Sequence, residues 1–337
     1  MKGRTISHAP AGPAPGAGRV TPLGVLAVAA ALAGALVPVW TQDAPFVLVM
    51  ASHAAVAALL AVSLDLLTGN TGLLSFGHAG WFGLGAYACG LAAKGWSAEL
   101  LLAVPVALVA ALLLSAAVGA ILVRQVGKAF AILTLAFSQV LYALVFLFSD
   151  VTGGEDGLQG IPVPTFFGRE IASQEAWYWL LYGTLVAVLA AAFALRRSPL
   201  GCAWLGIREN AERAHFVGMH VGRLKLYAYM ASAALAALAG ALHVLFNGAT
   251  SPETLHWFES GKVLMYMVLG GVGTIVGPAV GAVVFTLAEE TLSSVTDAWL
   301  IYFGALFVFI VIVAPGGLFG LAKPAWRRLA RRRGEPQ

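Results

Sequence analysis

The sequence has 337 residues, of which 60% are hydrophobic and 11% are charged, and its formal net charge is +4. Soluble domains carry about 25% charged residues, so a polar surface cannot cover this chain and a soluble fold is excluded. The basic residues stand in short segments beside apolar runs, which is typical of orientation in a membrane and not of nucleic-acid binding. We therefore expect an all-α, polytopic membrane protein that contacts membrane lipid and binds no nucleic acid.

The first 22 residues are rich in Pro, Gly and Ala and carry Lys2, Arg4 and Arg19. Such a segment buries too little apolar surface to fold, so residues 1–22 are expected to form a disordered cytoplasmic tail. The apolar run that follows, residues 23–40, ends without a convincing signal-peptide cleavage site. We interpret this run as a retained first membrane span.

Apolar runs long enough to cross a bilayer continue along the chain. At about 20 residues for each crossing, they predict about eight to ten transmembrane helices within a membrane domain of residues 23–315. The clearest runs after the first are residues 46–67, 100–123, 130–148, 177–195, 226–246 and 300–314. The range in the number of crossings comes from two glycine-interrupted regions, residues 68–95 and 262–290.

The loops differ in the sign of their charge. Loop 149–176 carries five acidic residues and one basic residue. The other charged segments are basic, namely Arg124 with Lys128, the segment 196–225 and the tail 316–337. Because basic loops stay on the cytoplasmic side, we expect loop 149–176 to lie outside and both termini to lie inside.

The polar segment 196–225 is an exception in an otherwise apolar sequence and must contact water. Ser198 is a suitable helix N-cap and Pro199 fits the first helical position. Gly218 is a suitable left-handed helix stop. These signals predict one helix in this segment, on the cytoplasmic side.

The predicted helix of segment 196–225 is amphipathic. Its apolar stripe consists of Trp204, Ile207, Ala211 and Ala214, which recur at helical spacing. The opposite face carries two charged pairs at i,i+4 spacing, Arg208–Glu212 and Glu209–Arg213. The stripe can lie on the lipid surface or dock into a groove of another protein, and a solvated surface helix is the remaining alternative.

Glycines interrupt two membrane segments at similar offsets. The first contains Gly69, Gly72 and Gly77, and the second contains Gly270, Gly273 and Gly277. Irregular backbone inside a membrane persists only where it is packed in protein or lines a water-filled path. A matched pair of this kind points to a translocation path, and close helix packing through small residues is the alternative.

A few polar residues fall inside or beside the apolar runs. We expect His78 to have a structural role, tied to a neighbouring carbonyl, with contact to solute as the alternative. We expect Asp65 to cap the first broken segment or to bond Asn70 or Thr71. We expect His53 and Gln139 to form hydrogen bonds between helices. Glu289 and Glu290 are interpreted as marking a membrane–water boundary.

Four patterns, taken together and in this order, resemble the permeases of branched-chain amino-acid ABC transporters. The first is carried by Asp65, Gly69, Gly72, Ser75, Gly77, His78 and Ala79, with Asn70 where an aromatic residue is expected. The others are TGGEDGLQGIP at 152–162, IREN at 207–210 followed by Ala214 and Gly218, and LGGVGTIVGP at 269–278. The resemblance covers about residues 58–315.

This resemblance implies a permease subunit of an ABC importer in the bacterial cytoplasmic (inner) membrane, carrying branched-chain amino acids. It implies cytoplasmic ABC ATPase subunits, a second permease chain and an external solute-binding protein as partners. The ATPase-coupling residues would be Trp204, Ile207, Arg208, Glu209, Asn210, Ala211, Ala214 and Gly218. The substrate pathway would include Asp65, Gly69, Asn70, Thr71, Gly72, Ser75, Gly77, His78, Gly270, Gly273 and Gly277.

The sequence lacks the common catalytic motifs. It contains no G-x-x-x-x-G-K-[ST] phosphate-binding loop, no H-E-x-x-H and no G-x-S-x-G. We therefore expect no catalysis, no cofactor and no metal, with ATP hydrolysis on a separate chain. The alternatives are an ABC permease for urea, a sugar or another amino acid, and a secondary transporter or channel that works alone.

Overall fold

The computed structural model describes residues 45–294 except residue 126, together with isolated positions on either side of that range. The expected spans at residues 23–40 and 300–314 and both terminal tails lie outside the continuously described residues. Five described helices are long and apolar enough to cross a membrane. The predicted all-α membrane class is therefore confirmed, whereas the number of eight to ten crossings stays a prediction.

Of the long helices among the described residues, five follow the predicted apolar runs closely and three lie mostly in the two glycine-interrupted regions. They are α2 (Pro45–Thr71), α3 (His78–Gly95), α4 (Leu100–Leu122), α5 (Lys128–Leu147), α7 (Gln174–Arg197), α10 (Val221–Asn247), α11 (Trp257–Gly270) and α12 (Val276–Ser293). The short elements are α6 (Ser149–Thr152), η1 (Gly154–Asp156), α8 (Pro199–Glu209), α9 (Ala211–Phe216) and η2 (Pro252–Leu255). Two strands of two residues each, β1 (Thr165–Phe166) and β2 (Arg169–Glu170), pair antiparallel and form a hairpin.

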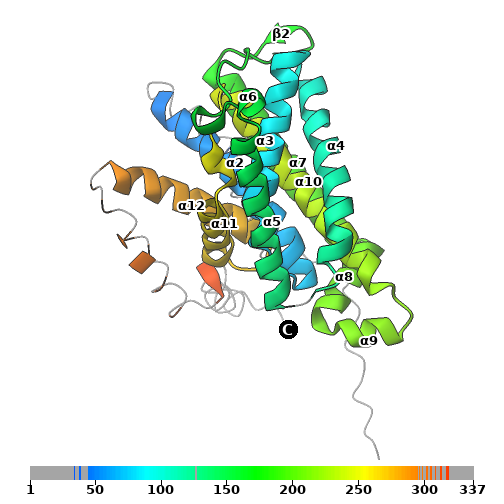
Figure 1. The fold of residues 1–337 in the computed structure, drawn as a ribbon. Coiled ribbons are helices and arrows are strands. Elements are labelled where there is room, and N and C mark those ends of the chain that lie inside the picture. The colour runs from blue at the N-terminus through cyan, green and yellow to red at the C-terminus, as the bar shows by residue number, and fades with distance from the viewer. Residues whose placement is uncertain are drawn as a thin grey trace, which may run out of the picture.

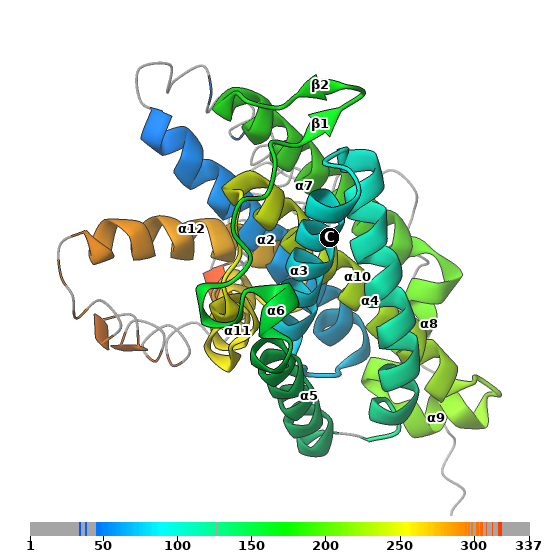
Figure 2. The same ribbon diagram turned by 45° about the horizontal axis from the view of Figure 1, so that its top comes forward.

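Helices α2 and α10 form the centre of the bundle (Figures 1 and 2). Helix α10 packs against α2, α3 and α4, and α2 also packs against α7 and α12. About two thirds of the most apolar stretches of α2 and α10 are buried, at 72% and 61%, against 28–33% in α4, α5 and α7. The outer faces of α4, α5 and α7 are therefore the surfaces that lipid or a second membrane chain can cover.

Small residues let α3 and α10 approach until their backbones touch. A Cβ atom added at Gly240 would lie 1.8 Å from the carbonyl oxygen of Phe82, and one added at Gly85 would lie 2.2 Å from that of Ala237. Neither position can accept a side chain without separating the helices. This contact fixes the position of α3 on the central pair of helices.

The bundle has two distinct ends. At the hairpin end, the loop after α5 joins the loop before α11 through backbone bonds between Leu158 and Thr250. The carboxylate of Glu99 accepts bonds there from Thr165 Oγ1 and Phe167 N, both at 2.7 Å. The bond from Thr165 is the main reason why the pKa of Glu99 lies below its usual value. The opposite end carries α8 and α9 (Figure 1) and is called the α8–α9 end.

Candidate functional site

Two breaks in the helices meet at the α8–α9 end. Residues 72–77 separate α2 from α3, and residues 271–275 separate α11 from α12. A Cβ atom added at Gly69 would lie only 2.8 Å from the Cα atom of Gly273. The two glycine-interrupted segments, residues 69–77 and 270–277, are thus in contact, and we call the place where they meet the glycine junction.

The carboxylate of Asp65 holds the second segment in place. Its Oδ1 accepts a hydrogen bond from Gly273 N at 2.5 Å, and its Oδ2 accepts one from Ile275 N at 3.2 Å. Ile275 has a φ of 66°, a region that β-branched residues rarely adopt. Asp65 is only 3% exposed. The sequence predicted that Asp65 caps the first broken segment. Its carboxylate instead caps the second broken segment, about 200 residues further along the chain.

Two arginines clamp the same junction from the α8–α9 end. Arg208 Nη1 donates a hydrogen bond to the carbonyl oxygen of Gly69, and Arg196 Nη1 donates one to that of Gly273 at 2.5 Å. Arg196 belongs to the end of α7, and Arg208 belongs to α8. The arginine clamp, Arg196 and Arg208, therefore links segment 196–225 to both broken segments.

The prediction of two charged pairs on segment 196–225 is wrong. The single predicted helix is divided at Asn210, whose side chain accepts a hydrogen bond from Arg213 N at 2.8 Å and caps α9. This break takes Arg208 away from Glu212, and within the described residues neither predicted pair forms an ion pair. The predicted N-cap at Ser198 and the left-handed Gly218, with a φ of 91°, are confirmed.

The apolar stripe of α8 faces the protein itself. Trp204 and Ile207 are 1% and 3% exposed, and Trp204 Nε1 donates to the carbonyl oxygen of Leu224 at 2.8 Å. Ala214 is also buried, and Ala211 is half-buried. The interpretation that this stripe docks into another protein is therefore wrong for Trp204 and Ile207. Their role is to seat α8 on α2, α7 and α10.

His78 joins three helices at the start of α3. Its Nδ1 lies 3.1 Å from Ser75 Oγ, and its Nε2 lies 2.7 Å from Ser232 Oγ of α10. Ser232 Oγ in turn donates to the carbonyl oxygen of Ser63 in α2 at 2.5 Å. Both ring nitrogens have hydrogen-bonding partners, which supports a structural role for this histidine, but the partners are serine hydroxyls and not the carbonyl that was expected.

The remaining predicted pathway residues are packed tightly. Asn70 Nδ2 and Thr71 Oγ1 donate to carbonyl oxygens one turn earlier in α2. A Cβ atom at Gly77 would lie 2.3 Å from Thr134 O, and one at Gly270 would lie 1.8 Å from the carbonyl oxygen of Gly277. Gly72 adopts a φ of 76° beside the side chain of Arg208. This density supports the helix-packing alternative, and passage of solute along these residues stays a prediction.

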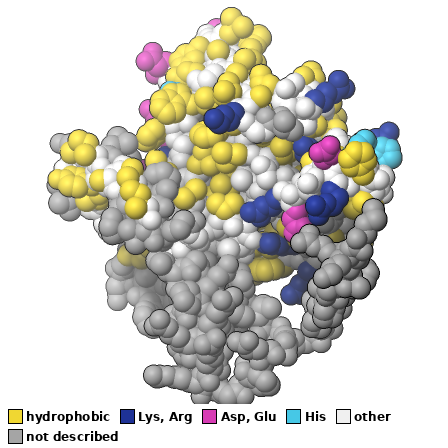
Figure 3. Space-filling view, turned by 90° about the horizontal axis from the view of Figure 1, so that it is seen from below, with side chains coloured by type: hydrophobic (Ala, Val, Ile, Leu, Met, Phe, Trp, Pro, Cys, Tyr) yellow, Lys and Arg dark blue, Asp and Glu magenta, His cyan; other side chains and the backbone are white. Residues whose placement is uncertain are grey.

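The water-facing surface of the α8–α9 end is basic, with an apolar tip. Figure 3 views the molecule from this side and shows Lys and Arg side chains gathered on it. The exposed basic residues are Arg124, Lys128, Arg197, Arg208, Arg213 and Arg223. At the tip of α9, Phe216 and Val217 are 80% and 75% exposed and Met219 is 36% exposed. We call these three residues the apolar tip.

Sequence reasoning missed an ionic cluster towards the hairpin end. Glu289 does not merely mark a membrane boundary, because its Oε1 lies 3.4 Å from Lys262 Nζ, which also lies 2.9 Å from Glu259 Oε1. The i,i+3 spacing of Glu259 and Lys262 in an apolar region was the available signal. Nearby, His53 Nε2 lies 3.1 Å from Asn247 Oδ1, so the bond predicted for His53 is confirmed. The bond predicted for Gln139 is not, because its buried Nε2 has no hydrogen-bonding partner among the described residues.

These features define a multi-pass helical membrane protein with a tightly packed junction linked to a basic surface. A sequence model for the permease component of branched-chain amino acid transport systems matches residues 46–314. The chain belongs to this family of permease components.

Relatives with curated descriptions agree with this family. The chain is 30% identical to the high-affinity branched-chain amino acid transport system permease protein LivM of Escherichia coli K12, over 79% of this chain and 68% of LivM. It is 31% identical to LivM of Salmonella typhimurium LT2, with the same coverage. It is 29% identical to LivH of Escherichia coli K12, over 46% of this chain and 50% of LivH. No solved structure matches the chain significantly.

Proposed function

We propose that this chain is a permease subunit of an ABC importer that carries branched-chain amino acids across the bacterial inner membrane. The observation that carries the proposal is the match of residues 46–314 to the permease components of such systems. The partners are cytoplasmic ATPase subunits, a second permease chain and an external solute-binding protein. The absence of a phosphate-binding loop from the sequence is consistent with ATP hydrolysis on a separate chain.

The arginine clamp gives this function a physical route from the ATPase to the membrane core. We place the ATPase contact at the apolar tip, because Phe216 and Val217 are exposed on a polar surface. Movement of α9 is passed to α8, which is seated on the bundle by Trp204. Movement of Arg208 and Arg196 then displaces the carbonyl oxygens of Gly69 and Gly273, to which they are hydrogen-bonded. Opening and closing of this junction would alternate the access of solute.

The charge difference between the two ends of the bundle supports one orientation of the chain in the membrane. The hairpin end carries the exposed acidic residues Asp150, Glu155, Asp156, Glu170 and Glu175, whereas the α8–α9 end is basic. Because basic segments remain in the cytoplasm, the α8–α9 end lies inside and the hairpin end lies outside. The binding protein would therefore dock at the hairpin end, on the surface opposite the ATPase.

Cysteine labelling tests this orientation. The positions are Val163, which is 51% exposed at the hairpin end, and Glu212, which is exposed on α9. Each is changed to Cys in a chain in which Cys89 and Cys202, the free cysteines, are replaced by Ser. In intact cells a membrane-impermeant maleimide should label the Cys at 163 and should label that at 212 only after lysis. Labelling of both from outside would contradict the orientation.

Affinity purification tests the class of transporter. Tagged chain extracted in mild detergent should bring down ATPase subunits with a phosphate-binding loop and a second permease chain, in fixed stoichiometry. Addition of ATP with the binding protein should be needed for turnover of that complex. Recovery of this chain alone, in a form that transports by itself, would favour the secondary transporter or channel.

A further inference from the structure

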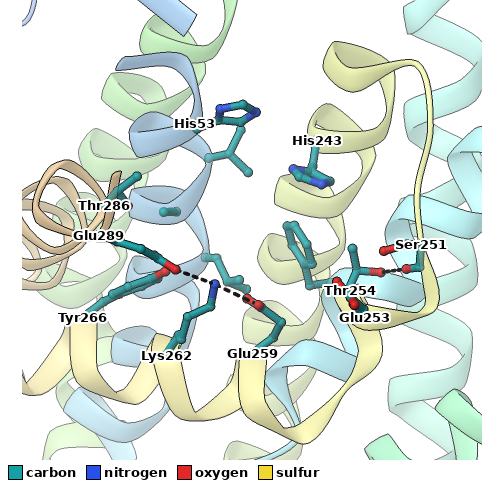
Figure 4. A pocket seen from close by; sticks show the side chains of 14 residues that line it. His53, His243, Ser251, Glu253, Thr254, Glu259, Lys262, Tyr266, Thr286 and Glu289 are labelled. Atoms are coloured by element: carbon teal, nitrogen blue, oxygen red, sulfur yellow. Dashed lines mark hydrogen bonds and ion pairs between the residues drawn. The ribbon is translucent and has the colours of Figure 1, made fainter. Parts of the chain in front are cut away.

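A cavity of about 300 Å³ opens between α2, α10, α11 and α12, towards the hairpin end (Figure 4). Its volume is at the lower limit of pockets that hold small molecules, about 300–1,000 Å³. None of the residues predicted from sequence to form the pathway lines it. In the proposed orientation the cavity lies in the outer half of the permease, where an arriving solute would first enter the membrane domain.

One wall of the cavity carries the ionic cluster. Lys262 Nζ lies between the carboxylates of Glu259 and Glu289, at 2.9 Å and 3.4 Å. The side chains of Lys262, Glu259 and Glu289 are 17%, 30% and 20% exposed, so solutes in the cavity can reach all three. Figure 4 shows the three groups converging from α11 and α12. One lysine between two glutamates leaves one negative charge unbalanced.

A purely structural explanation of this cluster is weak. Ionisable side chains inside a membrane domain are costly and are usually retained for a function. A buried ion pair is rarely more stabilising than apolar residues of the same volume. The contact between α11 and α12 is already made at Gly270, whose added Cβ atom would lie 1.8 Å from Gly277 O. The two helices therefore have a close contact that does not involve the ionic cluster.

The opposite wall is apolar apart from the imidazole rings of His53 in α2 and His243 in α10, which Figure 4 shows facing the same space. Val56, Ala57 and Leu60 of α2 line the cavity together with Phe82 of α3. Tyr266 and Thr286, which lie beside Glu289 in Figure 4, also line the cavity and add hydroxyl groups to it. The cavity thus combines one cation, an excess of carboxylates, a few hydroxyls and a hydrocarbon surface.

We infer that this cavity is a transient binding site for a zwitterionic amino acid with an apolar side chain. The ammonium group of the solute is held by Glu259 and Glu289, its carboxylate is held by Lys262, and its side chain contacts Val56, Ala57 and Leu60. A sugar or urea has no charges for the ionic cluster to hold. The inference rests on the proposed import function, because it assigns that function a site within the membrane domain.

The first test removes one positive and one negative charge from the ionic cluster in the complete transporter and leaves Glu259 in place. The double variant Lys262→Gln/Glu289→Gln is reconstituted with its partners and the binding protein, and uptake of radiolabelled leucine is measured beside ATP hydrolysis. We expect normal assembly, ATPase stimulation by the loaded binding protein within about 2-fold of wild type, and leucine uptake reduced at least 10-fold. The control Glu290→Gln changes a half-buried acid next to Glu289 that does not line the cavity, and it should leave both activities unchanged.

The second test changes the apolar wall and measures the ratio of leucine uptake to valine uptake. A general loss of structure would lower both rates without changing their ratio. Ala57→Leu narrows the cavity beside the bound side chain and should lower the ratio of leucine to valine uptake at least 5-fold. A normal uptake rate in the double variant Lys262→Gln/Glu289→Gln, or an unchanged ratio in Ala57→Leu, would overturn the site. If the wild-type transporter itself does not import leucine with ATP, the proposed function fails instead.

Discussion

Replacement of Asp65 by Ala should prevent stable assembly of the membrane domain. The carboxylate is 3% exposed and accepts hydrogen bonds from Gly273 N and Ile275 N, both of which would lose their acceptor. Hydrogen bonds to a charged group contribute about 1.5–3 kcal/mol each, so the free energy of unfolding should fall by about 3 kcal/mol or more. The amount of monodisperse protein in detergent and its melting temperature measure this effect.

Two control variants separate the role of the carboxylate from the loss of charge. Asp65→Asn keeps one amide oxygen as acceptor but points an NH₂ group at the other backbone donor. Its melting temperature should therefore lie between those of the wild type and Asp65→Ala. Asp150→Ala removes an exposed acid at the hairpin end and should leave the melting temperature unchanged. Wild-type stability of Asp65→Ala would mean that the junction is held by other contacts.

The variant Phe216→Asp should separate the ATPase from the permease without unfolding it. Phe216 is 80% exposed, so its replacement costs the isolated chain little. A central aromatic residue of an interface commonly contributes about 2 kcal/mol or more, which corresponds to about a 30-fold loss of affinity. The recovery of ATPase subunits with the tagged chain should fall accordingly, and ATP-dependent uptake should be lost.

Phe167→Asp is the matched control for this prediction. Phe167 is 75% exposed at the hairpin end, so the change is similar in chemistry and exposure but lies on the opposite surface. It should leave recovery of the ATPase unchanged. Equal recovery of the ATPase with Phe216→Asp and with wild type would place the ATPase contact elsewhere on the α8–α9 end.

Hydropathy was sufficient to predict the long helices. Each described helix in the set α2, α4, α5, α7 and α10 lies within a few residues of its apolar run. The helix cap at Ser198 and the left-handed stop at Gly218 were also predicted, because both depend on local backbone chemistry. The break at Asn210 was missed, because an Asn inside an amphipathic pattern can equally be a helical residue or a cap.

The partners within the site depend on contacts that spacing along the chain does not reveal. Glycine density located both halves of the glycine junction, but Asp65 and Gly273 are 208 residues apart. The stripe of Trp204 and Ile207 has the same pattern whether it faces lipid, a partner or its own chain, and only the fold shows that it faces its own chain. Arg208 is exposed, as expected, but its hydrogen bond to the carbonyl oxygen of Gly69 could not be predicted from spacing along the chain.

Uptake by proteoliposomes tests the central claim most directly. The vesicles contain this chain with its second permease and ATPase subunits, ATP is enclosed with the ATPase, and the solute-binding protein is added outside with radiolabelled leucine. The account predicts accumulation of leucine that requires both ATP hydrolysis and the binding protein. Accumulation by this chain without ATPase subunits, or ATP-driven import of urea or a sugar but not of leucine, would contradict it.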